Sequence, residues 1–352
     1  MENTSAKIGD SQALTKDGDT FWTNAKKEDS EWHTDDRAAL ETESYRYLHH
    51  PETVNETYDV WWTQTLRRKV LRETCDSLVD LETSSSAPGH LLVDDRNRFL
   101  FCEIRKVSSI AWRRVLDAVS SVNNSSATGG GHRRSRTGGL RRLGTYSAEE
   151  RERRLREYTK FLFVREPMLR LVSGWRDKFV AGPQRRDYRS SWGPRIRRYY
   201  NSQLTRHSSA SQDTGHQPSA SVEDVEISFP EFVKYLTAGP PRSPLMRDMH
   251  WEPYRSRCRP CLVRYDFVGH YETLGPDAAA ILPVLNRWSA GGGSVDFPIR
   301  RSDSLGVAQT EFPKLAPEDI VKLAKLYDVD YKLFGYSMSQ FMSWLQKNST
   351  AV

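Results

Sequence analysis

Two short stretches of the chain place basic and hydroxyl side chains directly after an apolar segment. The first follows apolar residues 99–104, precedes a helix expected near Ile110, and consists of Arg105, Lys106, Val107, Ser108 and Ser109. Backbone N–H groups at a helix N-terminus bind anions, and a lysine beside them can reach a phosphate. The stretch therefore predicts a site for a phosphorylated ligand. Taken alone, it is explained more simply by an exposed lysine and an ordinary serine N-cap.

The second stretch repeats this arrangement further along the chain. Residues Lys160–Val164 are expected to form a strand with Arg165 at its C-terminal end, where open α/β sheets place their ligand crevice. Pro167 then begins a helix, and Ser173 lies two turns into it, close enough to help Arg165 hold a phosphate. The alternative is that Arg165 pairs with Glu166 or another acid at the surface, which would contribute little.

The elements that must position these residues follow from hydrophobic periodicity. Val60, Leu66 and Val70 have helical spacing, and residues 91–104 predict a strand pair with its turn at 94–97. Further helices are expected near Pro230 and from Pro317. Because a strand precedes a helix at both 99–104 and 160–164, the sequence predicts an α/β domain with a parallel sheet.

The domain boundaries follow from changes in composition. Residues 1–58 are polar without apolar periodicity, and we expect them to be disordered. We expect one domain over 59–340, with mobile inserts near 123–147 and 202–223, and a C-terminal tail over 341–352. No run of about 18 apolar residues predicts a membrane helix, and the polar first residues lack the apolar core of a signal peptide.

Charge and cysteine content limit the classes of partner. The 352-residue chain has a formal net charge of +6, which suits an anionic partner such as a nucleotide, an acidic glycan or a nucleic acid. No recognition-helix, zinc or RNP pattern accompanies the charge, so a nucleic-acid-binding protein is disfavoured. The four cysteines are Cys75, Cys102, Cys258 and Cys261. Because there is no second CxxC and no pair of histidines, a structural role is favoured over a zinc site. In an oxidising compartment, we expect the cysteines to form disulfides.

Together with two later segments, these stretches resemble one enzyme family. They are similar to the Golgi carbohydrate sulfotransferases of the HNK-1 and chondroitin/dermatan 4-O-sulfotransferase type, which use 3′-phosphoadenosine 5′-phosphosulfate (PAPS). Residues 161–179, FLFVREPMLRLVSGWRDKF, look like the family's 3′-phosphate motif, and residues 102–116, CEIRKVSSIAWRRVL, like its 5′-phosphosulfate loop. Residues 250–278 and 323–337 resemble its HWxP…CxPC…YDFxGxxETLxxDA segment and its closing helix with LFGY.

This resemblance implies a P-loop-like α/β fold, with a central, mainly parallel sheet flanked by helices. It implies transfer of sulfate from PAPS to a glycan hydroxyl, such as that of GalNAc in chondroitin or dermatan, without a metal and in the Golgi lumen or membrane. Arg165 and Ser173 would bind the 3′-phosphate, and Lys106 with its loop the 5′-phosphosulfate. The family's loop proline, threonine and asparagine are Arg105, Ile110 and Ala111 here. The lost hydroxyl leaves open a catalytically impaired, glycan-binding pseudoenzyme of the same fold.

The resemblance also indicates roles in catalysis. Lys106 would stabilise the leaving oxygen of the nucleotide. His250 is the candidate general base, because the family shares its His-Trp pair and a neutral imidazole suits the task. The alternative is that His250 only orders the loop beside Trp251. Glu103 is a less suitable base because it lies late in a strand, where it is expected to be buried and paired. Asp266 and Glu272 are expected to be structural, and His270 is assigned no role.

An arginine cluster suits an acidic acceptor glycan. It could equally be a solvated face, and it comprises Arg170, Arg176, Arg185, Arg186, Arg195, Arg197 and Arg198. Five N-x-S/T triplets, which arise often by chance, weakly favour a secretory route. They begin at Asn3, Asn55, Asn123, Asn124 and Asn348.

Overall fold

The computed structural model describes residues 38–40, 58–78, 87–121, 140–207, 225–238, 245, 247–286, 297–299 and 302–349. Most of the expected N-terminal region 1–58 and of the inserts near 123–147 and 202–223 lies outside these residues. The insert boundaries differ from expectation at two places. Residues 141–145 form a short strand and a 3₁₀ turn, and residues 202–207 continue a long helix. Residues 341–349, expected to be a tail, belong to the last helix of the chain.

In the described part of the chain, five strands form one mixed sheet in the order β3-β1-β2-β4-β5. The strands are β1 Leu92–Asp94, β2 Phe99–Cys102, β3 Arg141–Arg142, β4 Thr159–Val164 and β5 Phe267–His270. β2, β4 and β5 are parallel, whereas β1 pairs antiparallel with both β2 and β3. The expected α/β class with a mainly parallel central sheet is therefore confirmed. The parallel strands bring their C-terminal ends to one edge of the sheet. The two stretches that the sequence predicts to bind phosphate, here called the anion-site stretches, begin at this edge.

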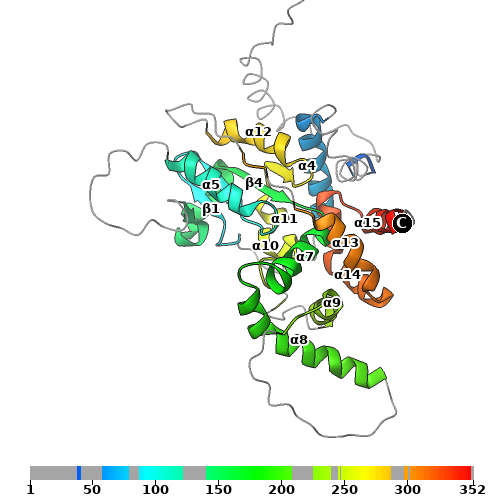
Figure 1. Ribbon diagram of the computed structural model, residues 1–352. Coiled ribbons are helices and arrows are strands. Elements are labelled where there is room, and N and C mark those ends of the chain that lie inside the picture. The colour runs from blue at the N-terminus through cyan, green and yellow to red at the C-terminus, as the bar shows by residue number, and fades with distance from the viewer. Residues whose placement is uncertain are drawn as a thin grey trace, which may run out of the picture.

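Helices surround this sheet (Figure 1). On the N-terminal side of the chain they are α4 Val60–Ser77, α5 Ser109–Ser121, α6 Ala148–Glu157, α7 Pro167–Trp175 and α8 Arg185–His207. A 3₁₀ turn, η3 Leu143–Thr145, precedes α6, and a π-helical turn, η4 Arg176–Val180, follows α7. The later helices are α9 Phe229–Ala238, α10 Tyr254–Cys258, α11 Pro260–Val263, α12 Leu274–Leu285, α13 Ser304–Glu311, α14 Pro317–Phe334 and α15 Met338–Ser349, with η5 Phe312–Lys314 between α13 and α14.

The helix ends carry the residues expected for capping. Ser147 and Glu150 form a reciprocal capping box at the start of α6. Pro167 occupies the first turn of α7, where its missing N–H costs nothing, and the preceding Glu166 side chain accepts the backbone N–H of Leu169 at 2.6 Å. α14 ends at Gly335, whose φ of 63° is left-handed and is adopted most easily by glycine.

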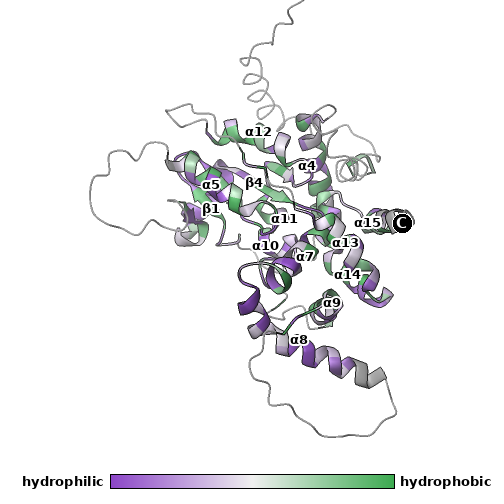
Figure 2. Ribbon diagram, viewed as in Figure 1, coloured by the Kyte–Doolittle hydropathy of each residue, from purple (hydrophilic) through white to green (hydrophobic). Residues whose placement is uncertain are grey.

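The core is centred on the sheet and on α5. Trp112 of α5 is fully buried, and its ring packs against Phe161 and Phe163 of β4. These contacts press the helix that follows the first stretch onto the strand that precedes the second. Figure 2 shows β4 as hydrophobic, whereas α8, on the far side of α7, is largely hydrophilic. The anion-site stretches thus begin on rigid elements, while α8 presents mainly polar side chains.

One disulfide joins the sheet to a later helix, and a second joins α4 to a later helix. Cys102 at the end of β2 is bonded to Cys258 of α10, and Cys75 of α4 is bonded to Cys261 of α11. The cysteines are therefore structural, as expected, and the CxxC pair serves two different bridges. None of the described helices has both the length and the apolar character needed to cross a bilayer.

Candidate active site

The two strand-to-helix turns meet at the C-terminal edge of the parallel strands. β2 and β4 are neighbours in register, with Cys102 opposite Leu162, so the residues that follow them leave the sheet side by side. Nη1 of Arg165 donates a hydrogen bond to the backbone oxygen of Lys106 over 3.4 Å. The structure therefore brings together Lys106 and Arg165, the two cations that the sequence placed at opposite ends of one ligand.

The loop between β2 and α5 has an unusual backbone. Lys106 and Ser108 both have positive φ, 71° and 61°, although neither is glycine. Such conformations cost about 1–3 kcal/mol each and cluster at ligand clamps. Between them, Val107 is buried in the core, and Ser109 begins α5 with 6% of its surface exposed. Packing of Val107 thus anchors the loop in the core between the two residues with positive φ.

Arg165 is buried and held over an aromatic ring. Its guanidinium carbon lies 4.2 Å from the centroid of Tyr271, and Nη2 donates to the hydroxyl of Ser302 at 3.3 Å. Its Nε is buried without a hydrogen-bond partner in the described part of the chain. Arg165 does not pair with Glu166, which caps α7 instead. An orphaned guanidinium donor at the end of a strand is the feature expected of an anion site.

Ser173 and Arg105 lie less centrally than the sequence suggested. Ser173 is half-buried two turns into α7, and among the described residues no hydrogen bond connects its side chain to Arg165. The guanidinium of Arg105 pairs with Glu103 over 3.4 Å and contacts Sδ of Met249 at 3.3 Å. The side chain of Arg105 thus lies toward the loop that carries His250.

Arg170 supports the backbone of the site and is unavailable to an acceptor. It is 1% exposed and donates to the backbone oxygens of Arg105, Met249 and Glu252 at 2.8–3.2 Å. One guanidinium thereby connects the 105–109 loop to the loop that carries His250. This corrects its expected place in the surface arginine cluster. The seven-arginine cluster contains five exposed residues on α8, which are Arg185, Arg186, Arg195, Arg197 and Arg198.

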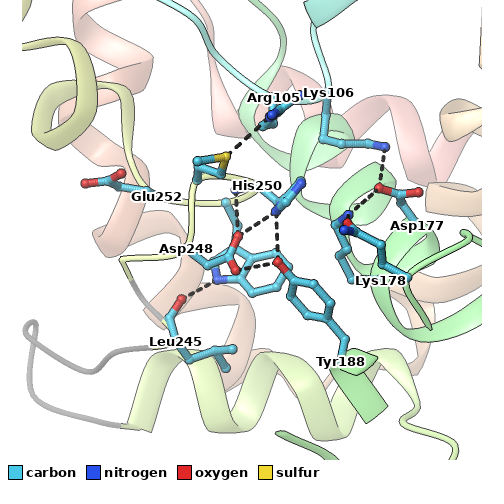
Figure 3. A network of polar contacts seen from close by, with 12 residues as sticks. Arg105, Lys106, Asp177, Lys178, Tyr188, Leu245, Asp248, His250 and Glu252 are labelled. Carbon is cyan, nitrogen blue, oxygen red and sulfur yellow. Dashed lines mark hydrogen bonds and ion pairs between the residues drawn. The ribbon is translucent and has the colours of Figure 1, made fainter. Parts of the chain in front are cut away.

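Two lysines converge on a single carboxylate (Figure 3). Nζ of Lys106 and Nζ of Lys178 each lie 3.2 Å from Oδ2 of Asp177. Burial lowers the pKa of Lys106, and the charge of Asp177 partly opposes this effect. The two lysine charges hold the pKa of Asp177 below its ordinary value although burial alone would raise it. Lys106 is thus positioned by an ion pair and does not project freely into solvent.

His250 is oriented by a carboxylate in the same region. Its Nδ1 lies 2.6 Å from Oδ1 of Asp248, and the hydroxyl of Tyr188 donates to the other oxygen of Asp248 at 2.7 Å. Burial lowers the pKa of His250, so the imidazole is neutral near pH 7, although Asp248 works in the opposite direction. Because the carboxylate accepts the proton of Nδ1, Nε2 carries the lone pair that a base requires. Figure 3 shows this group facing the lysine pair.

The other acidic residues of the site are structural. Glu103 is 7% exposed and pairs with Arg113 over 2.6 Å, as its position in the strand suggested. Asp266 accepts the backbone N–H of Lys160 at 2.8 Å. Glu272 accepts the backbone N–H of Glu166 at 3.0 Å, so it braces the turn after β4. No group of three or more metal-ligating side chains is arranged for a metal within the residues that the structure describes.

Sequence reasoning missed four members of the site. Asp248 stands only two residues before His250, and an acid at that spacing was the available signal for a histidine partner. Asp177 and Lys178 lie inside the quoted second stretch, but their roles depend on how the chain turns after α7. Tyr188 comes from α8, and no local sequence pattern connects it to Asp248.

The chain is similar to known proteins over the residues that form this site. The model described as "Sulfotransferase family" matches residues 89–337. Carbohydrate sulfotransferase 14 of Mus musculus is 35% identical over 71% of this chain and 60% of its own length. Carbohydrate sulfotransferase 8 of Mus musculus is 32% identical over 78% and 64%, respectively. Carbohydrate sulfotransferase 14 of Danio rerio is 31% identical over 81% and 68%.

The matched region includes both strand-to-helix turns, the histidine loop and both bonded cysteines of the CxxC pair. The chain spans about 60% of the length of the first of these relatives. No solved structure matches the chain.

Proposed function

We propose that this chain, which belongs to the sulfotransferase family, is a carbohydrate sulfotransferase that transfers sulfate from PAPS to a hydroxyl group of a glycan. The observation that carries the proposal is the contact between the two turns. Arg165, with its unpartnered buried Nε, lies against the backbone of Lys106. Two cations at adjacent strand ends suit a nucleotide that is phosphorylated at both its 3′ and its 5′ positions.

PAPS supplies an activated sulfonate, and the residues of the chain bind and orient it. Arg165 binds the 3′-phosphate through its guanidinium, whose Nε has no hydrogen-bond partner among the described residues. Lys106 binds the 5′-phosphosulfate and stabilises the negative charge that develops on the leaving phosphate oxygen. The N–H groups at the start of α5 and the hydroxyls of Ser108 and Ser109 surround the same group. The fixed backbone of this loop means that little reorganisation accompanies transfer.

His250 acts as the general base. Nε2 removes the proton of the attacking hydroxyl while Asp248 holds Nδ1–H, so the correct tautomer is present before the acceptor arrives. The oxygen–sulfur bond to the acceptor forms as the sulfur–oxygen bond to the nucleotide breaks, and the proton remains on His250. The products are a sulfated glycan and adenosine 3′,5′-bisphosphate (PAP).

The acceptor is an acidic glycan, and GalNAc of chondroitin or dermatan is our specific candidate. Support comes from α8, because Tyr188 lies beside His250 and exposed arginines continue along the same helix. Arg195 lies over the ring of Trp192, 5.4 Å from its centroid, which offers a charge and an aromatic surface together. Charge complementarity of this kind mainly increases association rates and selectivity.

The test is transfer of labelled sulfate from PAPS to desulfated chondroitin, desulfated dermatan and an HNK-1-type acceptor. Lys106→Ala and Arg165→Ala are measured beside the unmodified chain, with PAPS binding followed by calorimetry. Transfer by the unmodified chain that both substitutions abolish supports the proposal and identifies the acceptor. A folded chain that binds no PAPS contradicts it.

The second candidate is the glycan-binding pseudoenzyme. A specific observation favours keeping it: Ile110, which stands where the resembled family has threonine, is 64% exposed at the start of α5. It therefore presents an apolar side chain where a hydroxyl donor would suit the phosphosulfate. PAPS and glycan binding without transfer to any acceptor would identify this function.

We also propose a Golgi lumenal location. The two disulfides support it, because such bonds persist in the secretory pathway and are rare in the cytosol. Immunofluorescence of the full protein against a Golgi marker tests it, and a diffuse cytosolic signal contradicts it.

A further inference from the structure

We propose that Lys178 is a second catalytic cation, which binds the sulfonate group during its transfer while Asp177 positions it together with Lys106. The inference rests on the proposed function and adds a residue to it. Its basis is the placement of a buried ammonium group between the lysine of the nucleotide loop and the histidine of the acceptor side.

The contacts of Lys178 place it between Lys106, on the nucleotide side, and His250, on the acceptor side. Its Nζ shares Oδ2 of Asp177 with Nζ of Lys106, so the two ammonium groups contact one oxygen atom at 3.2 Å each. On its other side, Nζ lies 5.1 Å from the ring centroid of Tyr188. The hydroxyl of that tyrosine lies 3.4 Å from Nδ1 of His250. In the proposed reaction the sulfonate moves from the side of Lys106 toward the acceptor oxygen at His250, and Figure 3 shows Lys178 beside both side chains.

Within the cluster of Lys106, Asp177 and Lys178, positive charge exceeds negative charge, which suits an anion. Lys178 is only 4% exposed, and a buried ammonium group is costly unless it is paired. Asp177 supplies one negative charge to two lysines, which leaves one positive charge in excess. The charge of Lys178 also acts on both neighbours, lowering the pKa of Lys106 and that of His250. The negatively charged sulfonate of the donor would supply the missing charge.

The local backbone explains how consecutive residues can both face the site. In an α-helix, neighbouring residues in the sequence do not face each other. Here Asp177 and Lys178 belong to the π-helical turn η4, and their side chains meet over 3.2 Å. π-Helical turns occur frequently at functional sites. Gly182 completes the arrangement, because a Cβ there would lie 2.3 Å from Oδ1 of Asp177.

In the reaction, Lys178 binds the non-bridging oxygens of the sulfonate. Lys106 stabilises the bridging oxygen that leaves with the nucleotide, and His250 takes the proton of the acceptor. As sulfur moves between the two oxygens, the contact with Lys178 can persist on either side of the transfer. No bond to Lys178 forms or breaks, and its proton stays on Nζ. Its contribution is electrostatic and is largest in the transition state.

A purely structural role is the alternative, because Nζ of Lys178 also donates to Oε1 of Gln184 at 2.7 Å. That bond connects η4 to the start of α8. A structural role predicts that Lys178→Met and Gln184→Leu lower the melting temperature alike and weaken every ligand alike. A sulfonate contact predicts a selective effect that depends on whether the sulfonate is present on the nucleotide.

The experiment therefore compares binding of PAPS with binding of PAP, which lacks the sulfonate. Calorimetry and kcat are measured for the unmodified full chain and for its Lys178→Met, Lys178→Arg, Gln184→Leu and Arg165→Lys variants. We expect Lys178→Met to lower kcat by about 10²-fold, the effect of removing one transition-state donor, with PAP affinity retained. Lys178→Arg keeps the charge and should recover part of kcat. Arg165→Lys should weaken PAP and PAPS in equal proportion.

Loss of kcat in Lys178→Met with PAP binding intact supports the inference, and a simultaneous loss of the preference for PAPS over PAP strengthens it. A folded Lys178→Met chain that keeps kcat, or that loses PAP and PAPS affinity equally, overturns it. If Lys178→Met does not fold, a Lys178→Arg chain with no more kcat than Gln184→Leu also overturns it. Failure of the proposed function is distinct, because the unmodified chain would then bind no PAPS.

Discussion

Arg165 donates a hydrogen bond to the backbone oxygen of Lys106, so the side chain at the end of β4 touches the loop that follows β2. The two residues are 59 positions apart in the sequence. Their contact connects the two strand-to-helix turns, and both strands belong to the same buried sheet, so the sites proposed for the two ends of the nucleotide form one unit. A substitution that displaces one turn should therefore also displace the other.

Arg165→Lys should weaken the binding of PAP. The substitution keeps the charge but removes Nε, the planar stack on Tyr271 and the contact with Lys106. Hydrogen bonds to a charged group contribute about 1.5–3 kcal/mol, so we expect affinity to fall about 10- to 100-fold. Calorimetric titration with PAP measures it. Arg156→Lys, on the exposed face of α6, is the matched control, and equal affinities for the two variants would contradict the role of Arg165.

The main elements of the fold could be predicted because their signals are local. The apolar runs at 99–104 and 160–164 correspond to β2 and β4, and Pro167 and Pro317 begin α7 and α14. β3 could not be found this way, because it consists of two exposed arginines that pair with β1 only in the folded chain. Its formation depends on the edge of an existing sheet and not on a hydrophobic pattern.

The residues of the candidate site also divide into those with a local sequence signal and those without one. The positions of Arg165 and Lys106 were predictable because Arg165 directly follows β4 and Lys106 follows β2 after three residues, and a strand end fixes position. The place of Ser173 depends on how α7 is rotated, and residue spacing alone does not determine that. Arg170 was misjudged for a related reason: an arginine looks exposed by composition, yet here three backbone oxygens compensate its burial. Partners that arrive from distant elements, such as Tyr188, leave no local signal.

The pH dependence should report the Asp248–His250 pair. The base is active when neutral, so kcat/KM should rise with pH through the pKa of His250, which burial places below the ordinary value of about 6.5. Asp248→Asn removes the carboxylate that raises this pKa. The acidic limb should therefore move to lower pH, while the plateau falls because Nδ1–H is no longer fixed. His250→Gln should cost about 10²–10⁴-fold in kcat. An unchanged profile in Asp248→Asn would exclude this role.

Removing the Cys102–Cys258 bond should impair both stability and nucleotide binding. The bond closes a separation of 156 residues, and loss of such a native disulfide typically costs about 2–5 kcal/mol. It also ties the end of β2, directly before the 105–109 loop, to α10. We expect the Cys102→Ala/Cys258→Ala chain to melt earlier and to bind PAP more weakly. Cys75→Ala/Cys261→Ala is the control, with a lower melting temperature but a smaller effect on PAP; the reverse order would contradict the assignment.

His270 should limit stability in acid. It is fully buried and stacks on Tyr336 with a centroid separation of 4.8 Å, and neither ring nitrogen has a partner among the described residues. Burial lowers its pKa well below the ordinary value. As pH falls below about 6.5, the unfolded state takes up a proton that the folded state refuses, so stability is lost at up to about 1.4 kcal/mol per pH unit.

His270→Phe keeps the ring and removes the titration. Denaturant unfolding of both chains at pH 7 and pH 5 measures the effect, and the variant should lose less free energy of unfolding between the two values. The difference between the two pH values matters here, since the larger ring can shift stability equally at both. An equal loss in the two chains would mean that His270 is not responsible.

Ile110→Thr should improve catalysis. Ile110 lies at the start of α5 with 64% of its surface exposed, so replacing it sacrifices little buried apolar area. The new hydroxyl would add a donor beside the N–H groups at the start of α5, where we propose that the phosphosulfate binds. One hydrogen bond to a charged group contributes about 1.5–3 kcal/mol, so kcat/KM for PAPS should rise about tenfold or more. Ile110→Val is the matched control, because it keeps the β-branched shape without the hydroxyl.

The same pair of variants separates an active enzyme from a chain that has lost turnover. If the unmodified chain transfers no sulfate but Ile110→Thr does, the loss of activity is located at this single position. If both transfer and only Thr is faster, the remaining donors of the loop, Ser108 and Ser109, are sufficient for turnover. Equal rates for Thr and Val would show that the hydroxyl does not reach the phosphosulfate, because the two side chains differ only in that group.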